Sequence, residues 1–184
     1  MKPTEELSHE HQAILRMIRI LDKMADGLEA GADVAPGDLE DAVEFIRVFA
    51  DTCHHAKEEG HLFPEMERAG VPRDRGPLGV MLSEHEEGRK HVAAMARAIP
   101  GIRKKNKRAA GAFASAARGY GALLSQHIFK EDKILYPMAD ARLSPEQQSS
   151  LSECFDEVEK NIVGDGKHEE FHCLLERLEK AYPA

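Results

Sequence analysis

The chain contains one arrangement of histidine and carboxylate side chains twice, and both residue types are common metal ligands. The first copy covers residues 54–64 and the second covers residues 127–137. In each copy a Glu stands four positions after the first His, a second acidic residue follows it, and a Leu-aromatic-Pro sequence ends the copy. Because His and Glu four residues apart lie on one face of a helix, one helical turn can present both to a single metal ion.

A Glu-His pair precedes each copy, in similar sequence surroundings. The separation between this His and the first His of the following copy is nearly the same in the two halves. The duplication therefore predicts two metal ions held by two pseudo-equivalent halves. The candidate ligands are His11, His54, Glu58, His85, His127 and Glu131.

The segments around these motifs show the alternating three- and four-residue apolar spacing of bundle helices. Helices are expected over about residues 4–28, 36–61, 81–99, 113–138 and 144–162, with a last short helix from about residue 167. Ser144 and Gln147 form a capping-box sequence at the start of the fifth. We expect an all-α fold, in which residues 1–140 form an antiparallel four-helix bundle and residues 141–184 a C-terminal helical extension packed on it.

All six candidate ligands occupy positions that are apolar elsewhere in the helical stripes. Burying ionisable groups without partners costs on the order of several kcal/mol each. A metal ion removes this cost by converting the groups into ligands. The neighbouring His55, Glu59 and Asp132 are shifted by one or two positions, as are His9 and His91, and are expected to point away from the core.

The ligand types indicate which metal is present. Four imidazoles and two carboxylates suit two iron or manganese ions in a carboxylate-bridged pair, whereas structural zinc prefers closed four-ligand sites. If both Glu side chains bridge, each ion has two His nitrogens and two carboxylate oxygens as ligands. A bridging oxo or hydroxo group is then the fifth ligand, and one position on each ion stays open. Such a site in an apolar bundle suits a small diatomic molecule or peroxide.

These motifs resemble the hemerythrin-like, or HHE cation-binding, family over about residues 5–140. The resemblance implies a non-haem di-iron centre in a four-helix bundle, with a role in handling oxygen, nitric oxide, peroxide or iron. Carried over position by position, it implies that the ligands are His11, His54, Glu58, His85, His127 and Glu131.

Two positions depart from the pattern of oxygen-carrying hemerythrins. Arg89 stands four residues after His85, where those proteins resemble His-x-x-x-His. They also place an Asp five residues after the helix-four His, which here is Asp132, although the internal repeat favours Glu131. The missing His argues against simple reversible oxygen carriage. Arg89 is a candidate catalytic residue that pairs with a bridging Glu or stabilises a bound anion; the alternative is a solvated Arg at the stripe's edge.

Three further histidines are open as additional ligands. His61 lies seven residues after His54, but its counterpart in the second copy is the apolar Ile134. His168 and His172 are four apart on the last expected helix. Such a pair is more often on the surface. The alternative is that one of the two reaches the metal and takes the ligand position that Arg89 leaves vacant.

Composition narrows the functional classes. The net charge of −8 argues against a general nucleic-acid binder, which needs a basic surface. No apolar run approaches the roughly 20 residues that span a bilayer. Three cysteines cannot all pair and match no zinc motif, which favours a reducing compartment. We therefore expect a cytoplasmic monomer or small homo-oligomer.

Two functional hypotheses remain open. The protein is either an enzyme whose di-iron centre decomposes peroxide, in the manner of a catalase, or reduces another small oxidant, or a non-catalytic module that binds or senses oxygen, nitric oxide or iron. Arg89 and the reduced number of histidines slightly favour chemistry on reactive oxygen or nitrogen species. Iron storage is a third and weaker hypothesis.

Overall fold

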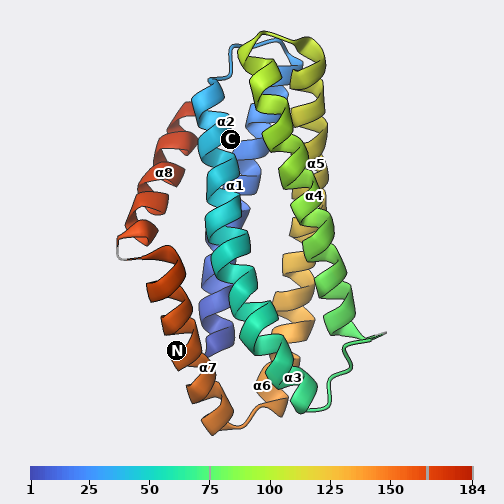
Figure 1. The fold of residues 1–184 in the computed structure, drawn as a ribbon, viewed down its shortest axis with the longest axis vertical. Helices are drawn as coiled ribbons and strands as arrows, with labels where there is room; N and C mark the ends of the chain where they lie inside the picture. Colours follow the sequence, from blue (N-terminus) through green and yellow to red (C-terminus); the bar gives the residue numbers. More distant parts are fainter. Residues whose placement is uncertain (75, 165, 184) are drawn as a thin grey trace.

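The computed structural model describes residues 1–74, 76–164 and 166–183, but not the side chains of residues 162, 163 and 168. The described residues form helices and turns, with no strand among them. The bundle has four antiparallel columns, each made of one helix or of consecutive α- and π-helical segments. Further helices lie along one side of the bundle (Figure 1). The all-α bundle expected from the sequence is therefore confirmed.

The first column is α1 (Pro3–Glu29). The second contains α2 (Pro36–Phe45), η1 (Ile46–His55), η2 (Glu58–Leu62) and α3 (Phe63–Arg68). The third is α4 (Pro77–Arg103), and the fourth contains α5 (Lys107–Lys130), η3 (Glu131–Leu135) and α6 (Tyr136–Arg142). The chain then continues through α7 (Pro145–Val158), η4 (Glu159–Val163) and α8 (Lys167–Ala181).

Local sequence signals set several helix ends. The Ser144 hydroxyl accepts a hydrogen bond from the Gln147 backbone N–H at 3.3 Å, and the Gln147 side chain accepts one from the Ser144 N–H at 2.9 Å, which confirms the expected capping box. Asn106 caps α5 through its side-chain oxygen. One expected end is wrong, because α4 continues through Pro100 to Arg103. Pro100 removes one N–H donor close to the end of the helix, where few turns remain to be disrupted.

The second and fourth columns contain π-helical turns at equivalent places in the repeat. η2 begins at Glu58 and η3 begins at Glu131, so each wide turn starts at the repeated Glu. The longer segment η1 ends at His55. π-Helical turns are rare and occur frequently at functional sites. They change which residues share a face, and the sequence expectations assumed the α-helical period throughout.

The apolar core consists of two clusters, and the candidate ligands lie between them. Along α1, Leu7 belongs to one cluster and Ile14 to the other, with His11 between the two. Along α4, Met81 and Val92 flank His85 in the same way. The ionisable layer is therefore closed above and below by packed apolar side chains.

The C-terminal helices pack against the bundle (Figure 1). Phe155 of α7 is buried in the Leu7 cluster, and Leu175 of α8 is buried in the Ile14 cluster. The division of the chain near residue 140 stays a prediction. Among the described residues, no helix combines the length and the apolar composition needed to cross a membrane.

Candidate metal centre

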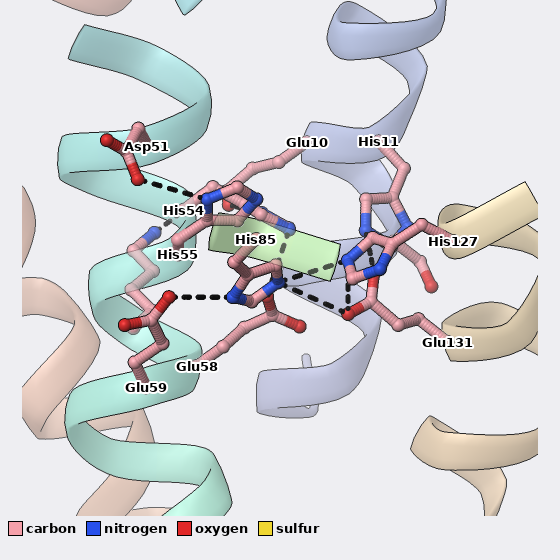
Figure 2. Close-up of polar contacts among 12 residues, drawn as sticks. Glu10, His11, Asp51, His54, His55, Glu58, Glu59, His85, His127 and Glu131 are labelled. Atoms are coloured by element: carbon pink, nitrogen blue, oxygen red, sulfur yellow. Dashed lines mark hydrogen bonds and ion pairs between the residues drawn. The ribbon is translucent and has the colours of Figure 1, made fainter. Parts of the chain in front are cut away.

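The six predicted ligand side chains meet in one buried layer, and each is at most 1% exposed. α1 contributes one His, the second column a His and a Glu, α4 one His, and the fourth column a His and a Glu. Figure 2 shows the imidazoles and both carboxylates converging on one small volume. The structure thus brings together every residue that the duplicated motif singled out: His11, His54, Glu58, His85, His127 and Glu131.

Glu131 lies between histidines of both halves. Its Oε2 is 3.2 Å from His11 Nε2 and its Oε1 is 3.0 Å from His127 Nε2. An oxygen pair that faces imidazoles from two halves is suited to bridging two metal ions.

Glu58 holds the equivalent position on the other side of the layer. Its Oε2 is 3.7 Å from His54 Nε2 and 3.4 Å from His85 Nε2. Glu58 and Glu131 therefore each contact one histidine from each half of the chain.

Three carboxylate oxygens in this layer are buried and lack an aligned hydrogen-bond donor, namely Glu58 Oε2 and both oxygens of Glu131. Leaving a buried carboxylate unsatisfied is costly, and such atoms in proteins usually have a donor or a cation beside them. His85 Nε2 and His127 Nε2 also face each other at 3.0 Å. The donor set of inward nitrogens and unsatisfied carboxylate oxygens fits metal ions.

A second ring of carboxylates holds the outer nitrogen of each candidate histidine. Within each half, the Glu of the Glu-His pair accepts from the motif His: Glu10 Oε2 is 2.7 Å from His54 Nδ1, and Glu84 Oε2 is 2.8 Å from His127 Nδ1. With Nδ1–H donating outward, the Nε2 lone pair faces the centre. The Glu that precedes each leading His therefore orients the motif His of its own half.

The second acid of each repeat makes the matching contact across the halves. Asp132 Oδ1 is 2.9 Å from His11 Nδ1, and Glu59 Oε1 is 2.7 Å from His85 Nδ1. Both acids were expected to point away from the core, and both are half-buried in this ring instead. The signal for their role was the acid at the fifth position of both copies. The structure places Glu131 in the centre and Asp132 outside it.

These contacts shift the pKa values of the metal-free layer. Burial lowers the pKa of His11, but its hydrogen bond with Asp132 and its close contact with the Glu131 carboxylate outweigh burial and raise the pKa to about 9. The pKa of His85 also rises to about 9, because its close contact with the Glu58 carboxylate and its hydrogen bond with Glu59 outweigh its burial. The His11 and His85 rings therefore each hold a proton at neutral pH when no metal is bound.

His55 is a buried member of the layer, which corrects the expectation that it points away. Its exposed fraction is 5%, and its ring stacks on His85 with 3.8 Å between the ring centroids. Nitrogen and oxygen atoms of His55, Glu58, His85 and His127 lie within 4.8 Å of one another. Burial and the nearby His85 lower the pKa of His55 to about 3, so its ring is neutral. The π-helical turns of η1 place consecutive histidines on the inner face.

Tyr136 gives the two halves different chemistry. Its hydroxyl donates to Glu58 Oε1 at 2.8 Å and lies 3.3 Å from His11 Nε2. Its counterpart in the first copy is Phe63, which stacks near His85 without a polar atom. At this position of the repeat, the second copy therefore brings a hydroxyl group into the layer and the first copy does not. The aromatic position of the repeat carried this signal, but sequence reasoning assigned it no role.

Arg89 does not make the expected contact with a bridging Glu. Its guanidinium lies 2.8 Å from Asp51 and 2.6 Å from Glu59, and it also binds Glu86 at 2.8 Å. Glu59 holds His85, and Asp51 lies 3.2 Å from His55 Nδ1. Arg89 thus reaches the layer through the carboxylates that hold its histidines.

Lys57 is a fully buried cation beside the layer. Its Nζ lies 2.7 Å from Glu6, 2.5 Å from Glu10 and 2.7 Å from Glu159. Although burial lowers the pKa of Lys57, the contact with Glu10 and the other carboxylates raises it overall. Because Glu10 also holds His54, this ion-pair group connects η4 to the candidate centre.

The other histidines left open by the sequence have different surroundings. His61 lies half-buried near Phe155, with 6.5 Å between the ring centroids, and belongs to no candidate metal group among the described residues. His172 is exposed on α8. The side chain of His168 lies outside the described residues.

Comparison with known proteins agrees with this geometry. The model of the hemerythrin HHE cation-binding domain matches residues 2–139. Three curated relatives, uncharacterized proteins of Mycobacterium bovis and of two Mycobacterium tuberculosis strains, are each 24% identical over 161 residues, which is 88% of this chain. The chain spans 62% of the length of each relative. No solved structure matches the chain at a significant level.

Proposed function

Because the chain belongs to the hemerythrin HHE cation-binding family, we propose that its buried layer holds two iron ions that react with small oxidants. The observation that carries this proposal is the set of three unsatisfied carboxylate oxygens among inward-facing imidazole nitrogens. Oxidants of the proposed size are dioxygen, nitric oxide and hydrogen peroxide. Chemistry in oxidative or nitrosative stress is the favoured role.

The residues divide naturally into two sets of ligands. His11 and His54 would serve one ion, His85 and His127 the other, and Glu58 and Glu131 would bridge them. Candidate metal groups among the described residues contain only His and carboxylates, with no cysteine. Nitrogen and oxygen donors without thiolate favour iron or manganese over structural zinc.

When bound, iron supplies electron transfer to and from a small oxidant. The chain's own residues set the conditions for that chemistry. Tyr136 holds a proton at its hydroxyl between Glu58 Oε1 and His11 Nε2. The apolar clusters above and below exclude bulk water from the layer. Arg89 fixes the Glu59 carboxylate that orients His85.

The test is metal analysis of the iron-reconstituted protein, followed by an optical spectrum and peroxide addition. We expect two iron ions per chain and catalytic consumption of peroxide. One ion or fewer per fully loaded chain contradicts the di-iron centre, and retention of zinc alone contradicts the redox role. Two bound iron ions with no turnover would assign the runner-up function, non-catalytic binding or sensing.

A further inference from the structure

A pocket of about 400 Å³ opens between η1, α4 and α5, on the outer side of the histidine layer. The side chains of Ile46, Val92 and Ala96 give it mainly apolar walls. His55 forms part of its lining, so one imidazole ring separates the pocket from His85. Pockets that bind small molecules have volumes of roughly 300–1,000 Å³, apolar walls and a few polar groups.

Tyr120 forms part of the wall of this pocket. Its side chain lines the pocket and is 2% exposed, and its hydroxyl has no hydrogen-bond partner among the described residues. A buried phenolic hydroxyl without a partner is unfavourable, since it has lost its hydrogen bonds to water. Its existing surroundings therefore leave one hydrogen bond available to an occupant of the pocket.

Arginine side chains line the same pocket at positions 47, 89 and 97. Arg89 is committed to three carboxylates, including Asp51, which also lines the pocket. Arg47 and Arg97 are exposed, and no described carboxylate forms an ion pair with either of them. Two guanidinium groups are therefore free to bind an anion, for which their planar donor pattern is well suited.

We propose that this pocket binds a small organic anion with an apolar body. The anionic head group binds Arg47 and Arg97, the apolar body packs on the walls formed by η1 and α4, and Tyr120 donates or accepts a hydrogen bond. This site is separate from the chemistry proposed above, because dioxygen, nitric oxide and peroxide have no apolar body to fill such a volume. Its occupancy does not depend on which metal the histidine layer holds.

The test is calorimetric titration of the metal-loaded protein with 4-phenylbutyrate, compared with 4-phenylbutanol and acetate. 4-Phenylbutyrate has both the apolar body and the anionic group, whereas 4-phenylbutanol lacks the charge and acetate lacks the apolar body. We expect 4-phenylbutyrate to bind at least about tenfold more tightly than either, since a hydrogen bond to a charged group contributes about that much or more. Binding no tighter than that of acetate or 4-phenylbutanol would overturn the proposal.

Variants locate the binding. The double variant R47Q/R97Q should bind 4-phenylbutyrate about tenfold or more less tightly. R19Q changes an exposed arginine of α1 outside the pocket and should leave the affinity for 4-phenylbutyrate unchanged. A93F should block the probe by filling the pocket while retaining the metal content. Unchanged affinity in the double variant, or in A93F, would place the probe elsewhere and refute the site.

Tyr120→Phe keeps the test independent of misfolding. Removing a hydroxyl that has no partner should leave the thermal midpoint unchanged or raise it, while 4-phenylbutyrate binds several-fold more weakly. A lowered midpoint with unchanged affinity would show that the hydroxyl serves the fold and not a ligand.

Discussion

Loading the metal-free protein with metal is expected to expel protons, and this makes pH the most direct perturbation of the candidate centre. The pKa values of His11 and His85 lie at about 9 because hydrogen bonds with carboxylates outweigh their burial. At pH 7 both rings are therefore protonated. A metal ion needs the Nε2 lone pair, so it displaces these protons.

The magnitude follows from the number of displaced protons. We expect at least about two protons released per chain at pH 7, one each from His11 and His85. His127 adds to this release, because its contact with Glu131 outweighs its burial and raises its pKa as well. Below pH 9 the apparent affinity should change about tenfold per pH unit for each proton that a metal ion displaces. Above pH 9 both effects should disappear, since the rings are already neutral.

The same shifts predict how the stability of the metal-free protein depends on pH. A histidine whose pKa rises from 6.5 in the unfolded chain to about 9 in the fold stabilises the fold fully below pH 6.5. This contribution, on the order of 3 kcal/mol for each ring, is lost as the pH rises from 6.5 through 9. Metal-free protein should therefore unfold at lower urea concentrations at pH 9 than at pH 6.5.

The assay is anaerobic titration of weakly buffered metal-free protein with ferrous iron, with proton release followed by a pH indicator. Asp132→Asn is the matched variant, because it replaces the carboxylate beside His11 Nδ1 with a neutral group. Its proton release should fall by about one per chain compared with the unmodified protein. Release of less than one proton by the unmodified protein at pH 7, or urea stability that is flat between pH 6.5 and 9, would refute the reasoning.

Three other predictions concern single side chains. Glu131→Ala should halve the iron content or remove it. Asp132→Ala should keep both ions at saturating iron but bind them about 10–100-fold more weakly, as is found for other groups that orient metal-binding histidines. Equal metal loss in the two variants would contradict the assignment of Glu131 as the ligand. Arg89→Ala should retain both ions and slow peroxide consumption, because the variant frees the carboxylates that hold two histidines. An unchanged rate of peroxide consumption would show that Arg89 only forms ion pairs at the surface. Lys57→Met should lower the free energy of unfolding by about 3–5 kcal/mol, measured by urea denaturation, because it leaves Glu10 buried without its cation; a loss below 1 kcal/mol would contradict this role for the ion pairs.

The sequence by itself determined the helical bundle and the six candidate ligands that meet in the inner layer. Apolar spacing predicts the helices because burial of one face dominates their packing, and Ser144 marks a helix start through hydrogen bonds to its near neighbours. The repeat identifies His11, Glu58 and their counterparts as candidate ligands, because ionisable groups at core positions require partners. The helices and caps are inferred from residues within one or two helical turns, and the ligands from comparing two short motifs that the chain repeats.

Only the tertiary structure decided what surrounds that layer. His55 turns inward because π-helical turns replace the assumed period of 3.6 residues. Glu59 and Asp132 each hold a histidine from the other half of the chain, and Arg89 binds carboxylates instead of a bridging Glu. Such partners come from different helices, and helical periodicity does not show which atoms of a neighbouring helix a side chain meets. The pocket beside Tyr120 depends on three elements at once, and for that reason no local sequence pattern indicated it.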